Sequence, residues 1–191
     1  MTAIERVLSA SIATKQRLLE DAALLGRIQA VVDRLVDTYR NDGKVLFCGN
    51  GGSAGDAQHL AAELSGRFYL DRPPLYAEAL HVNSSYLTAV GNDYGYDEVF
   101  ARMVRAAARP GDVVVGLSTS GNSPNVLRAL AVATEQGATT VGMTGQSGGK
   151  MADAVDLLLN VPSADTPRIQ ECHITIGHIV CELVEATLFG K

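Results

Sequence analysis

The chain has 191 residues, of which 47% are hydrophobic and 19% charged, and its net charge is −5. A chain of this length forms one ordinary domain and buries roughly 70% of its unfolded surface. The acidic balance argues against a general nucleic-acid binder, which needs a basic surface to displace counterions. No run of about 20 apolar residues is present, and the first residues are amphipathic, so we expect neither a transmembrane helix nor a secretory signal. The three cysteines, Cys48, Cys172 and Cys181, are expected to be reduced and apolar in role, as in a cytoplasmic protein.

The predicted elements begin with helix and then alternate. Apolar residues recur every three or four positions through residues 1–42, which predicts a helical extension divided at Gly26. Residues 43–191 predict an α/β core. Strands are expected at 45–48, 75–82, 113–117, 139–144 and 156–161, and helices at 53–66, 97–108, 124–136 and 168–189, with a short helix after Gly148-Gly149. This alternation indicates a parallel sheet with right-handed crossovers and helices on both faces. The extension would pack on the sheet or on another subunit.

Two loops rich in glycine and serine follow the two clearest strands, and each opens a helix. The first is Gly49–Ser53 and the second is Ser118–Pro124, where Ser123 suits an N-cap and Pro124 the first helical position. Ligands of open α/β sheets bind beyond the carboxyl ends of strands, and helix N-termini there attract anions. Neither loop matches a nucleotide-binding pattern. The alternatives are a phosphate site or ordinary turns with helix caps.

Histidine, glutamate and glutamine side chains form a second group of candidates. His59 and Glu63 are four residues apart on one predicted helix face, so they could converge on an ion or a substrate atom, or form a solvated polar face. On the last helix Gln170 and His178 share a face, but about 12 Å of helix separates them. They could serve one ion only by reaching far inward or by coming from different subunits. A buried structural role is the alternative for His178 and, more so, for His173.

The segment Gly91–Asp93 has the composition of a turn. Its Asn92 and Asp93 side chains could also bind sugar hydroxyls, and both interpretations remain open.

Taken together, these motifs carry a resemblance over nearly the whole chain. They are Cys48-Gly-Asn-Gly-Gly-Ser53, Ala57-Gln-His-Leu-Ala-Ala-Glu63, Gly91-Asn-Asp93, Leu117-Ser-Thr-Ser-Gly-Asn-Ser123, Met143-Thr-Gly145, and Arg168-Ile-Gln-Glu-Cys-His173 with His178 beyond. The chain resembles the phosphoheptose isomerases of the sugar isomerase (SIS) domain superfamily. Some members carry an aspartate where this chain has Pro167, so no role is transferred to that position or to Asp165.

The resemblance implies a single SIS domain over residues 1–191 with a five-stranded parallel, flavodoxin-like sheet. It implies a homotetramer with active sites between subunits, with the 1–42 extension as assembly surface, and a phosphorylated seven-carbon sugar as substrate. It implies Glu63 and His178 as the acid–base pair, and one zinc per subunit on His59, Glu63, Gln170 and His178. The implied substrate contacts are Asn50, Gly51, Gly52, Ser53, Glu63, Asn92, Asp93, Ser118, Thr119, Ser120, Ser123 and Gln170.

Moving a proton between C1 and C2 of a sugar phosphate through an enediol needs a base for the carbon-bound proton and an acid or Lewis acid for the oxygens. Glu63 would serve as base or as metal ligand, and the sequence leaves this choice open. The main alternative is a non-catalytic SIS protein that binds the replication initiator DnaA, a relative that lacks equivalents of Glu63 and His178. Other SIS isomerases or etherases acting on amino-sugar phosphates are a third class.

Overall fold

The computed structural model describes residues 1–190. Its five strands form one parallel sheet in the order β2-β1-β3-β4-β5. The strands are β1 (Val45–Gly49), β2 (Ala77–Ala79), β3 (Val113–Leu117), β4 (Thr139–Thr144) and β5 (Leu157–Asn160). The α-helices are α1 (Ala3–Glu20), α2 (Ala22–Arg40), α3 (Gly52–Ser65), α4 (Ser84–Tyr94), α5 (Val99–Ala107), α6 (Pro124–Glu135) and α7 (Thr166–Phe189). Two short 3-10 helices are η1 (Tyr96–Glu98) and η2 (Gly149–Asp153). The predicted five-stranded parallel α/β fold is confirmed.

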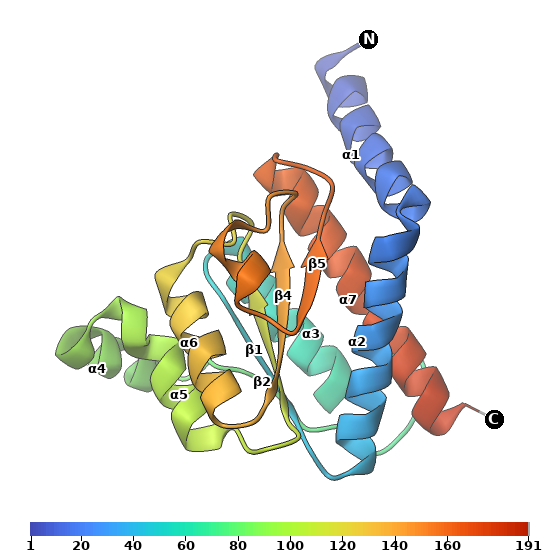
Figure 1. Ribbon diagram of the computed structural model, residues 1–191. Helices are drawn as coiled ribbons and strands as arrows, with labels where there is room; N and C mark the ends of the chain where they lie inside the picture. Colours follow the sequence, from blue (N-terminus) through green and yellow to red (C-terminus); the bar gives the residue numbers. More distant parts are fainter. Residues whose placement is uncertain (191) are drawn as a thin grey trace.

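Helices cover both faces of the sheet (Figure 1). One apolar core joins α2, α3 and α7 to alternate strand residues such as Val45 and Phe47. The other joins α4, α5 and α6 to the intervening residues, such as Leu46 and Cys48. Successive strand side chains point to opposite faces, so a continuous apolar run such as Val45–Cys48 serves both cores. The two layers leave the carboxyl ends of the strands at one edge, where the loops of interest begin.

The N-terminal helices divide at Asp21 and not at Gly26. The Asp21 side chain accepts a hydrogen bond from the Leu24 N–H and so caps α2. Gly26 lies inside α2, where a side chain would meet only open space. The helix α1 projects beyond the sheet (Figure 1). It exposes a run of apolar residues on its outer face, namely Ile4, Val7, Leu8 and Ile12.

Two further predictions about elements were wrong. Residues 84–94, which include the expected turn at Asn92-Asp93, form the helix α4. Asn83 caps this helix by accepting a hydrogen bond from the Tyr86 N–H. The strand expected over 75–82 is only Ala77–Ala79, because it pairs with one neighbour, β1, at the edge of the sheet.

By length and composition α7 could cross a membrane, with a mean hydropathy of 1.3 over 18 residues, and 44% of that window is buried inside the fold. It packs against α2 and α3, with buried Ile176 and Val184 in the same core as the sheet. A central core helix of a layered protein has this composition. Cys48, Cys172 and Cys181 are all buried, in agreement with the expected apolar role, and none of the three forms a disulfide within residues 1–190.

Candidate active site

The two predicted loops lie side by side at the carboxyl edge of the sheet. They follow β1 and β3, which are neighbours, and the order of the strands reverses direction between these two. Helices α3 and α6 begin at these loops, so two helix N-termini face the same region. Helix N-termini offer free N–H groups and partial positive charge. An acidic chain can therefore bind a phosphate here without a lysine.

A pair of asparagines joins the two loops. The side-chain amides of Asn50 and Asn125 donate to each other's oxygens at 2.9 Å in both directions. The Tyr96 hydroxyl also donates to Asn50 Oδ1 at 3.3 Å. Asn125 is buried in the first turn of α6. The predicted substrate residue Asn50 thus also fixes the position of one loop against the other.

Hydroxyl groups cluster on the second loop, as predicted. Ser118 Oγ lies 2.9 Å from Ser123 Oγ and 3.5 Å from Ser120 Oγ. Ser123 occupies the N-cap position of α6, but its side chain makes no cap hydrogen bond. Ser123 therefore stands at the expected position, but the expected capping hydrogen bond is absent. The Ser123 hydroxyl instead belongs to the hydroxyl cluster, where it can also bind a ligand.

Burial differs among the predicted substrate residues of the two loops. Ser53 and Ser118 are buried, whereas Gly51, Gly52 and Ser120 are exposed and Thr119 is half-buried. The exposed residues form the surface that a ligand would meet first.

Close packing of α3 against α7 brings His59, Glu63 and His178 together. Gly177 of α7 faces Leu60 of α3, and a Cβ at Gly177 would lie only 2.4 Å from Leu60 Cδ2. The absence of a side chain lets the two helices approach. The neighbouring residues His178 and His59 then meet at the outer edge of this contact, with their Nε2 atoms 2.8 Å apart.

His59, Glu63 and His178 form one compact group. His59 Nε2 lies 3.2 Å from Glu63 Oε1, and one ligand atom from each residue lies within 4.8 Å of the other two. The His59 side chain is 49% exposed and that of Glu63 24% exposed, so the group opens to solvent. The ring of Phe68 lies 5.7 Å from that of His178 and forms one wall.

The donor set of this group fits a metal ion such as zinc. Two imidazoles and a carboxylate are ligands that Zn²⁺ accepts, and ligand atoms on a tetrahedral zinc lie about 3.3 Å apart. The two short separations in the cluster, 2.8 and 3.2 Å, are near this value. Two imidazole nitrogens that face each other this closely can share one proton or one ion, because two N–H groups would repel. The cluster could therefore hold a metal with an open position for substrate.

The side chain of Gln170, the fourth expected ligand, contacts the N-terminal end of α3. It lies against Gly52 at the start of α3, where a Cβ would be 2.6 Å from Gln170 Nε2. His59 is seven residues further along α3, about 10 Å of helix away. His178, in contrast, meets His59 and Glu63 of its own chain, so the three need no second subunit. The predicted separation of Gln170 from His178 is thus retained in the fold.

Asn92 and Asp93 lie on α4, the helix that precedes Tyr96 and its hydrogen bond to Asn50. They are exposed in the last turn of α4, where Asn92 Nδ2 donates to Asp93 Oδ1 at 2.8 Å. Helix α4 projects on the side of the sheet covered by α5 and α6 (Figure 1).

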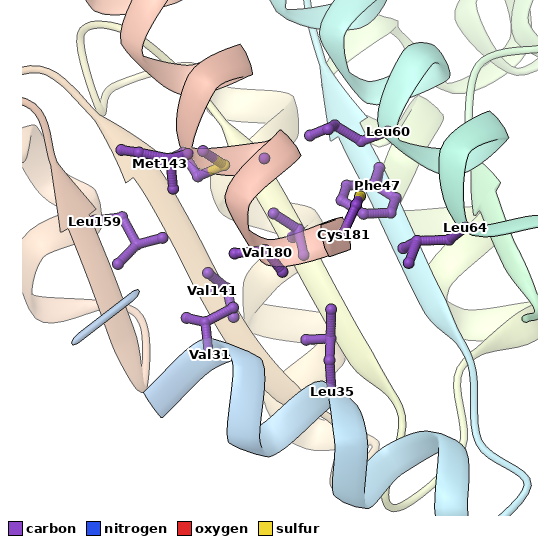
Figure 2. Close-up of a pocket in the computed structure, with 13 residues that line it drawn as sticks. Val31, Leu35, Phe47, Leu60, Leu64, Val141, Met143, Leu159, Val180 and Cys181 are labelled. Carbon is purple, nitrogen blue, oxygen red and sulfur yellow. The ribbon is translucent and has the colours of Figure 1, made fainter. Parts of the chain in front are cut away.

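An enclosed cavity of about 30 Å³ lies inside the core between the sheet and α2, α3 and α7 (Figure 2). Side chains such as Val31, Leu35, Phe47 and Met143 line it, and none of its lining groups is polar. A sugar phosphate needs hydrogen bonds to its hydroxyl and phosphate groups, so this cavity cannot be the substrate site.

His173 has the structural role that the sequence left as an alternative. Its side chain is fully buried, and Nε2 donates to the Thr144 carbonyl at 3.1 Å. The pKa of His173 is lowered to about 4, because the effect of burial outweighs the opposing effect of the hydrogen bond to Thr144. Its ring is therefore neutral at pH 7. It takes no part in the exposed cluster.

Several residues at the site were missed by sequence reasoning. Asn125 directly follows Pro124, the last residue of the predicted serine loop. This proximity was the only feature of the sequence that could have indicated its contact with Asn50. Asp56, three residues before His59, has a buried oxygen, Oδ2, without a hydrogen-bond partner among residues 1–190. Burial raises the pKa of Asp56, and the nearby His59 opposes the shift.

Comparisons with known proteins agree with this geometry. Residues 6–145 match the model of the SIS domain family. The phosphoheptose isomerase of Mycobacterium tuberculosis is 57% identical over 186 residues, which cover 97% of this chain and 95% of that protein. The chain belongs to the phosphoheptose isomerase family of SIS domain proteins.

Other members of the family are similar over their whole length. The phosphoheptose isomerase of Burkholderia pseudomallei is 54% identical over 95% of this chain and 94% of its own. The structure of phosphoheptose isomerase from Neisseria gonorrhoeae superposes with a TM-score of 0.90 at 45% identity, covering 97% of this chain and all of that one. The comparisons favour an isomerase over the DnaA-binding alternative.

Proposed function

We propose that this chain interconverts D-sedoheptulose 7-phosphate and D-glycero-D-manno-heptose 7-phosphate, the first step of nucleotide-activated heptose synthesis. The observation that carries the proposal is the group formed by His59, Glu63 and His178 on the exposed edge of α3 and α7. It supplies a carboxylate and two imidazoles, two of them on the helix α3 whose N-terminus lies at the first loop. Family membership supplies the substrate class.

In the proposed reaction Glu63 removes a proton from C1 of the ketose, and the carbonyl oxygen at C2 gains a proton. The resulting enediol loses its O1 proton, and C2 receives a proton to give the aldose. His178 handles the protons on the two oxygens, and Glu63 returns the carbon-bound proton. A carboxylate and an imidazole beside each other can divide these roles, one serving the carbon atoms and the other the oxygens.

The phosphate group would bind the second loop. The hydroxyls of Ser118, Thr119, Ser120 and Ser123 donate to its oxygens, together with backbone N–H groups at the start of α6. The first loop, with Asn50, Gly51, Gly52 and Ser53, would hold the sugar near the start of α3. Asn92, Asp93 and Gln170 are further proposed contacts.

We assign the metal site to His59, Glu63 and His178, with Gln170 as a fourth ligand and zinc as the metal. A bound metal would polarise the sugar carbonyl and hydroxyl groups. Glu63 cannot be a full ligand and a free base at once. The Gln170 amide lies beside Gly52, and about 10 Å of helix separates Gly52 from His59. This separation favours a site completed by another copy of the chain.

The exposed surface of α1 supports a proposal about assembly. The exposed apolar residues Ile4, Leu8 and Ile12 lie on one face of α1 and are 73%, 58% and 68% exposed. Apolar patches of this kind mark interaction surfaces. We propose that the 1–42 extension packs between copies in a cytoplasmic homotetramer, with the sites at the interfaces.

The test is to incubate the protein with sedoheptulose 7-phosphate, with and without a chelator, and follow heptose 7-phosphate by NMR. We expect product from the untreated protein and a loss of turnover with Glu63→Gln. The matched control is Glu135→Gln, an exposed position at the end of α6, with turnover unchanged. Absence of product under both conditions would refute the function. Product that is unaffected by the chelator would refute a required metal.

A further inference from the structure

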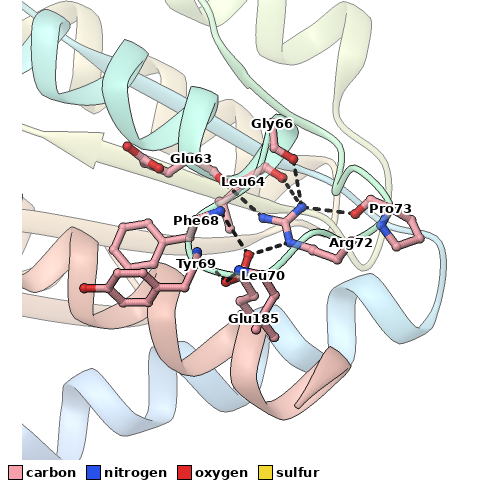
Figure 3. A network of polar contacts seen from close by, with 9 residues as sticks. All are labelled: Glu63, Leu64, Gly66, Phe68, Tyr69, Leu70, Arg72, Pro73 and Glu185. Atoms are coloured by element: carbon pink, nitrogen blue, oxygen red, sulfur yellow. Dashed lines mark hydrogen bonds and ion pairs between the residues drawn. The ribbon is translucent and has the colours of Figure 1, made fainter. Parts of the chain in front are cut away.

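The guanidinium of Arg72 closes the end of the helix that carries Glu63 (Figure 3). Its Nη2 donates to the Glu63 carbonyl at 3.0 Å, and its Nη1 donates to the Leu64 carbonyl at 2.8 Å. Nη1 also reaches the carbonyls of Gly66 and Pro73 at 3.3 and 3.1 Å. The last carbonyls of a helix have no partner within it, and a cation there complements the helix dipole. The Arg72 side chain therefore holds the last turn of α3, together with the Leu75 N–H, which donates to the Leu64 carbonyl at 3.1 Å.

Glu185 of α7 holds both Arg72 and that loop (Figure 3). Its carboxylate accepts the backbone N–H groups of Phe68, Tyr69 and Leu70 at 3.0, 2.6 and 2.7 Å, and Arg72 Nε at 2.8 Å. Both side chains of the ion pair are 2% exposed. Burial alone would raise the pKa of Glu185, but the four donors together lower it. The carboxylate is thus ionised and all of its oxygens are bonded.

This pair connects the two proposed catalytic residues. Glu185 lies seven residues after His178, two turns along the same face of α7. Arg72 contacts the backbone of Glu63, and Phe68, whose N–H is bonded to Glu185, places its ring 5.7 Å from that of His178. A shift of the 66–72 loop would move the backbone of Glu63 and the wall beside His178 together.

We infer that Arg72 and Glu185 are positioning residues for the isomerase, which set the placement of Glu63 relative to His178 by joining the end of α3 to α7. The inference rests on the proposed function of Glu63 and His178. Neither member of the pair touches the substrate in this account. Both act through the backbone of Glu63 and the ring of Phe68.

A second buried pair provides the matched control. Asp112 accepts the backbone N–H groups of Lys44 and Arg109 at 3.0 and 2.8 Å, and its carboxylate lies 2.6 Å from Lys44 Nζ. Its side chain is 3% exposed. It precedes β3, at the opposite end of the strand from the serine loop. Asp112→Asn therefore makes the same chemical change as Glu185→Gln at a place remote from the cluster.

The experiment compares Glu185→Gln, Arg72→Lys and Asp112→Asn with the unmodified chain, at a temperature where all are folded by circular dichroism. We expect Glu185→Gln to lower kcat about tenfold or more while KM for sedoheptulose 7-phosphate changes less than about threefold, since the phosphate loops are untouched. Arg72→Lys keeps the charge but loses the fork that reaches Glu63 and Leu64, so it should also lower kcat. If Glu185→Gln does not fold, the measurements on Arg72→Lys take its place. Asp112→Asn should keep kcat within about twofold.

A second readout does not depend on turnover. The ring C–H signals of His59 and His178 in proton NMR should shift in Glu185→Gln and stay in place in Asp112→Asn. Unshifted ring signals with unchanged kcat in Glu185→Gln would overturn the inference. An equal loss of kcat in Asp112→Asn would also overturn it, because the effect would then be general destabilisation. An unmodified chain with no turnover would refute the proposed function alone, since the ring signals still test the positioning.

Discussion

Replacing Gly52 by alanine displaces the Gln170 amide, at a position of the first loop that we also propose to contact the sugar. A Cβ at Gly52 would lie 2.6 Å from Gln170 Nε2 and 3.0 Å from its Cδ and Oε1. Ordinary contact begins near 3.4 Å, so the amide must move by about 0.8 Å or more. The amide is the end of a flexible side chain, and it can move without disturbing the core.

The expected effects on activity and stability have opposite signs. A misplacement of about 1 Å in a catalytic constellation costs on the order of 100-fold in rate. The change from glycine to alanine in a helix stabilises it by about 0.5–1 kcal/mol. Gly52→Ala should therefore lower kcat/KM by roughly 100-fold, while the Tm stays the same or rises by a few degrees.

Gly55→Ala is the matched control in the same helix. A Cβ there meets nothing within 4 Å, so it should give the gain in stability without the loss of activity. The assays are thermal unfolding by circular dichroism and steady-state turnover of sedoheptulose 7-phosphate. Normal turnover of Gly52→Ala would refute a functional role for the Gln170 amide at this place. Equal inactivity of Gly55→Ala would show that the backbone at the start of α3, and not Gln170, is what the reaction needs.

Two further predictions concern the serine loop and the buried histidine. Ser123→Ala should raise KM, and the Ki of inorganic phosphate, about tenfold or more, since a hydrogen bond to a charged group contributes about 1.5–3 kcal/mol. Its Tm should fall by only a few degrees, because Ser123 makes no cap bond and loses one hydrogen bond, to Ser118 Oγ, which contributes about 1 kcal/mol; a large loss of Tm with an unchanged KM would contradict this. For His173, whose pKa falls from 6.5 to about 4 on folding, the unfolded chain binds the proton first as the pH falls. Stability should drop by about 2 kcal/mol between pH 7 and pH 5 and level off below pH 4. His173→Gln should flatten this dependence in urea unfolding, while its Nε2 keeps a donor for the Thr144 carbonyl; an unchanged slope would refute the assignment.

Local patterns predicted the parts of the site that depend on one element. The convergence of His59 and Glu63 follows from their spacing on a helix, and the separation of Gln170 from His178 follows from helical rise. The neighbouring positions of the two loops follow from the topology of a parallel sheet.

Contacts between distant elements could not be predicted in this way. His178 reaches His59 because Gly177 allows α7 to pack on Leu60, and nothing in the sequence around Gly177 indicates its partner. Arg72 and Glu185 are 113 residues apart. In the sequence they read as charges on a loop and on a helix face.

Two errors of element assignment have local causes. Asp21 is a typical N-cap residue and could have predicted the break between α1 and α2. The break was instead predicted at Gly26 because glycine weakens helices. The helix α4 buries only Val90. The sequence of α4 therefore lacks the regular apolar spacing of a buried helix, and Gly91, Asn92 and Asp93 favoured the prediction of a turn.

The most direct test of the account is isomerisation of sedoheptulose 7-phosphate in D₂O with the product analysed by NMR. The side chain of Glu63 is 24% exposed, so the proton that it takes from C1 can exchange with solvent before C2 is protonated, and we expect heptose 7-phosphate that carries deuterium at C2. Glu63→Gln should form neither product nor deuterated substrate. Product formed by Glu63→Gln at the normal rate, with or without deuterium, would contradict the assignment of Glu63 as the base.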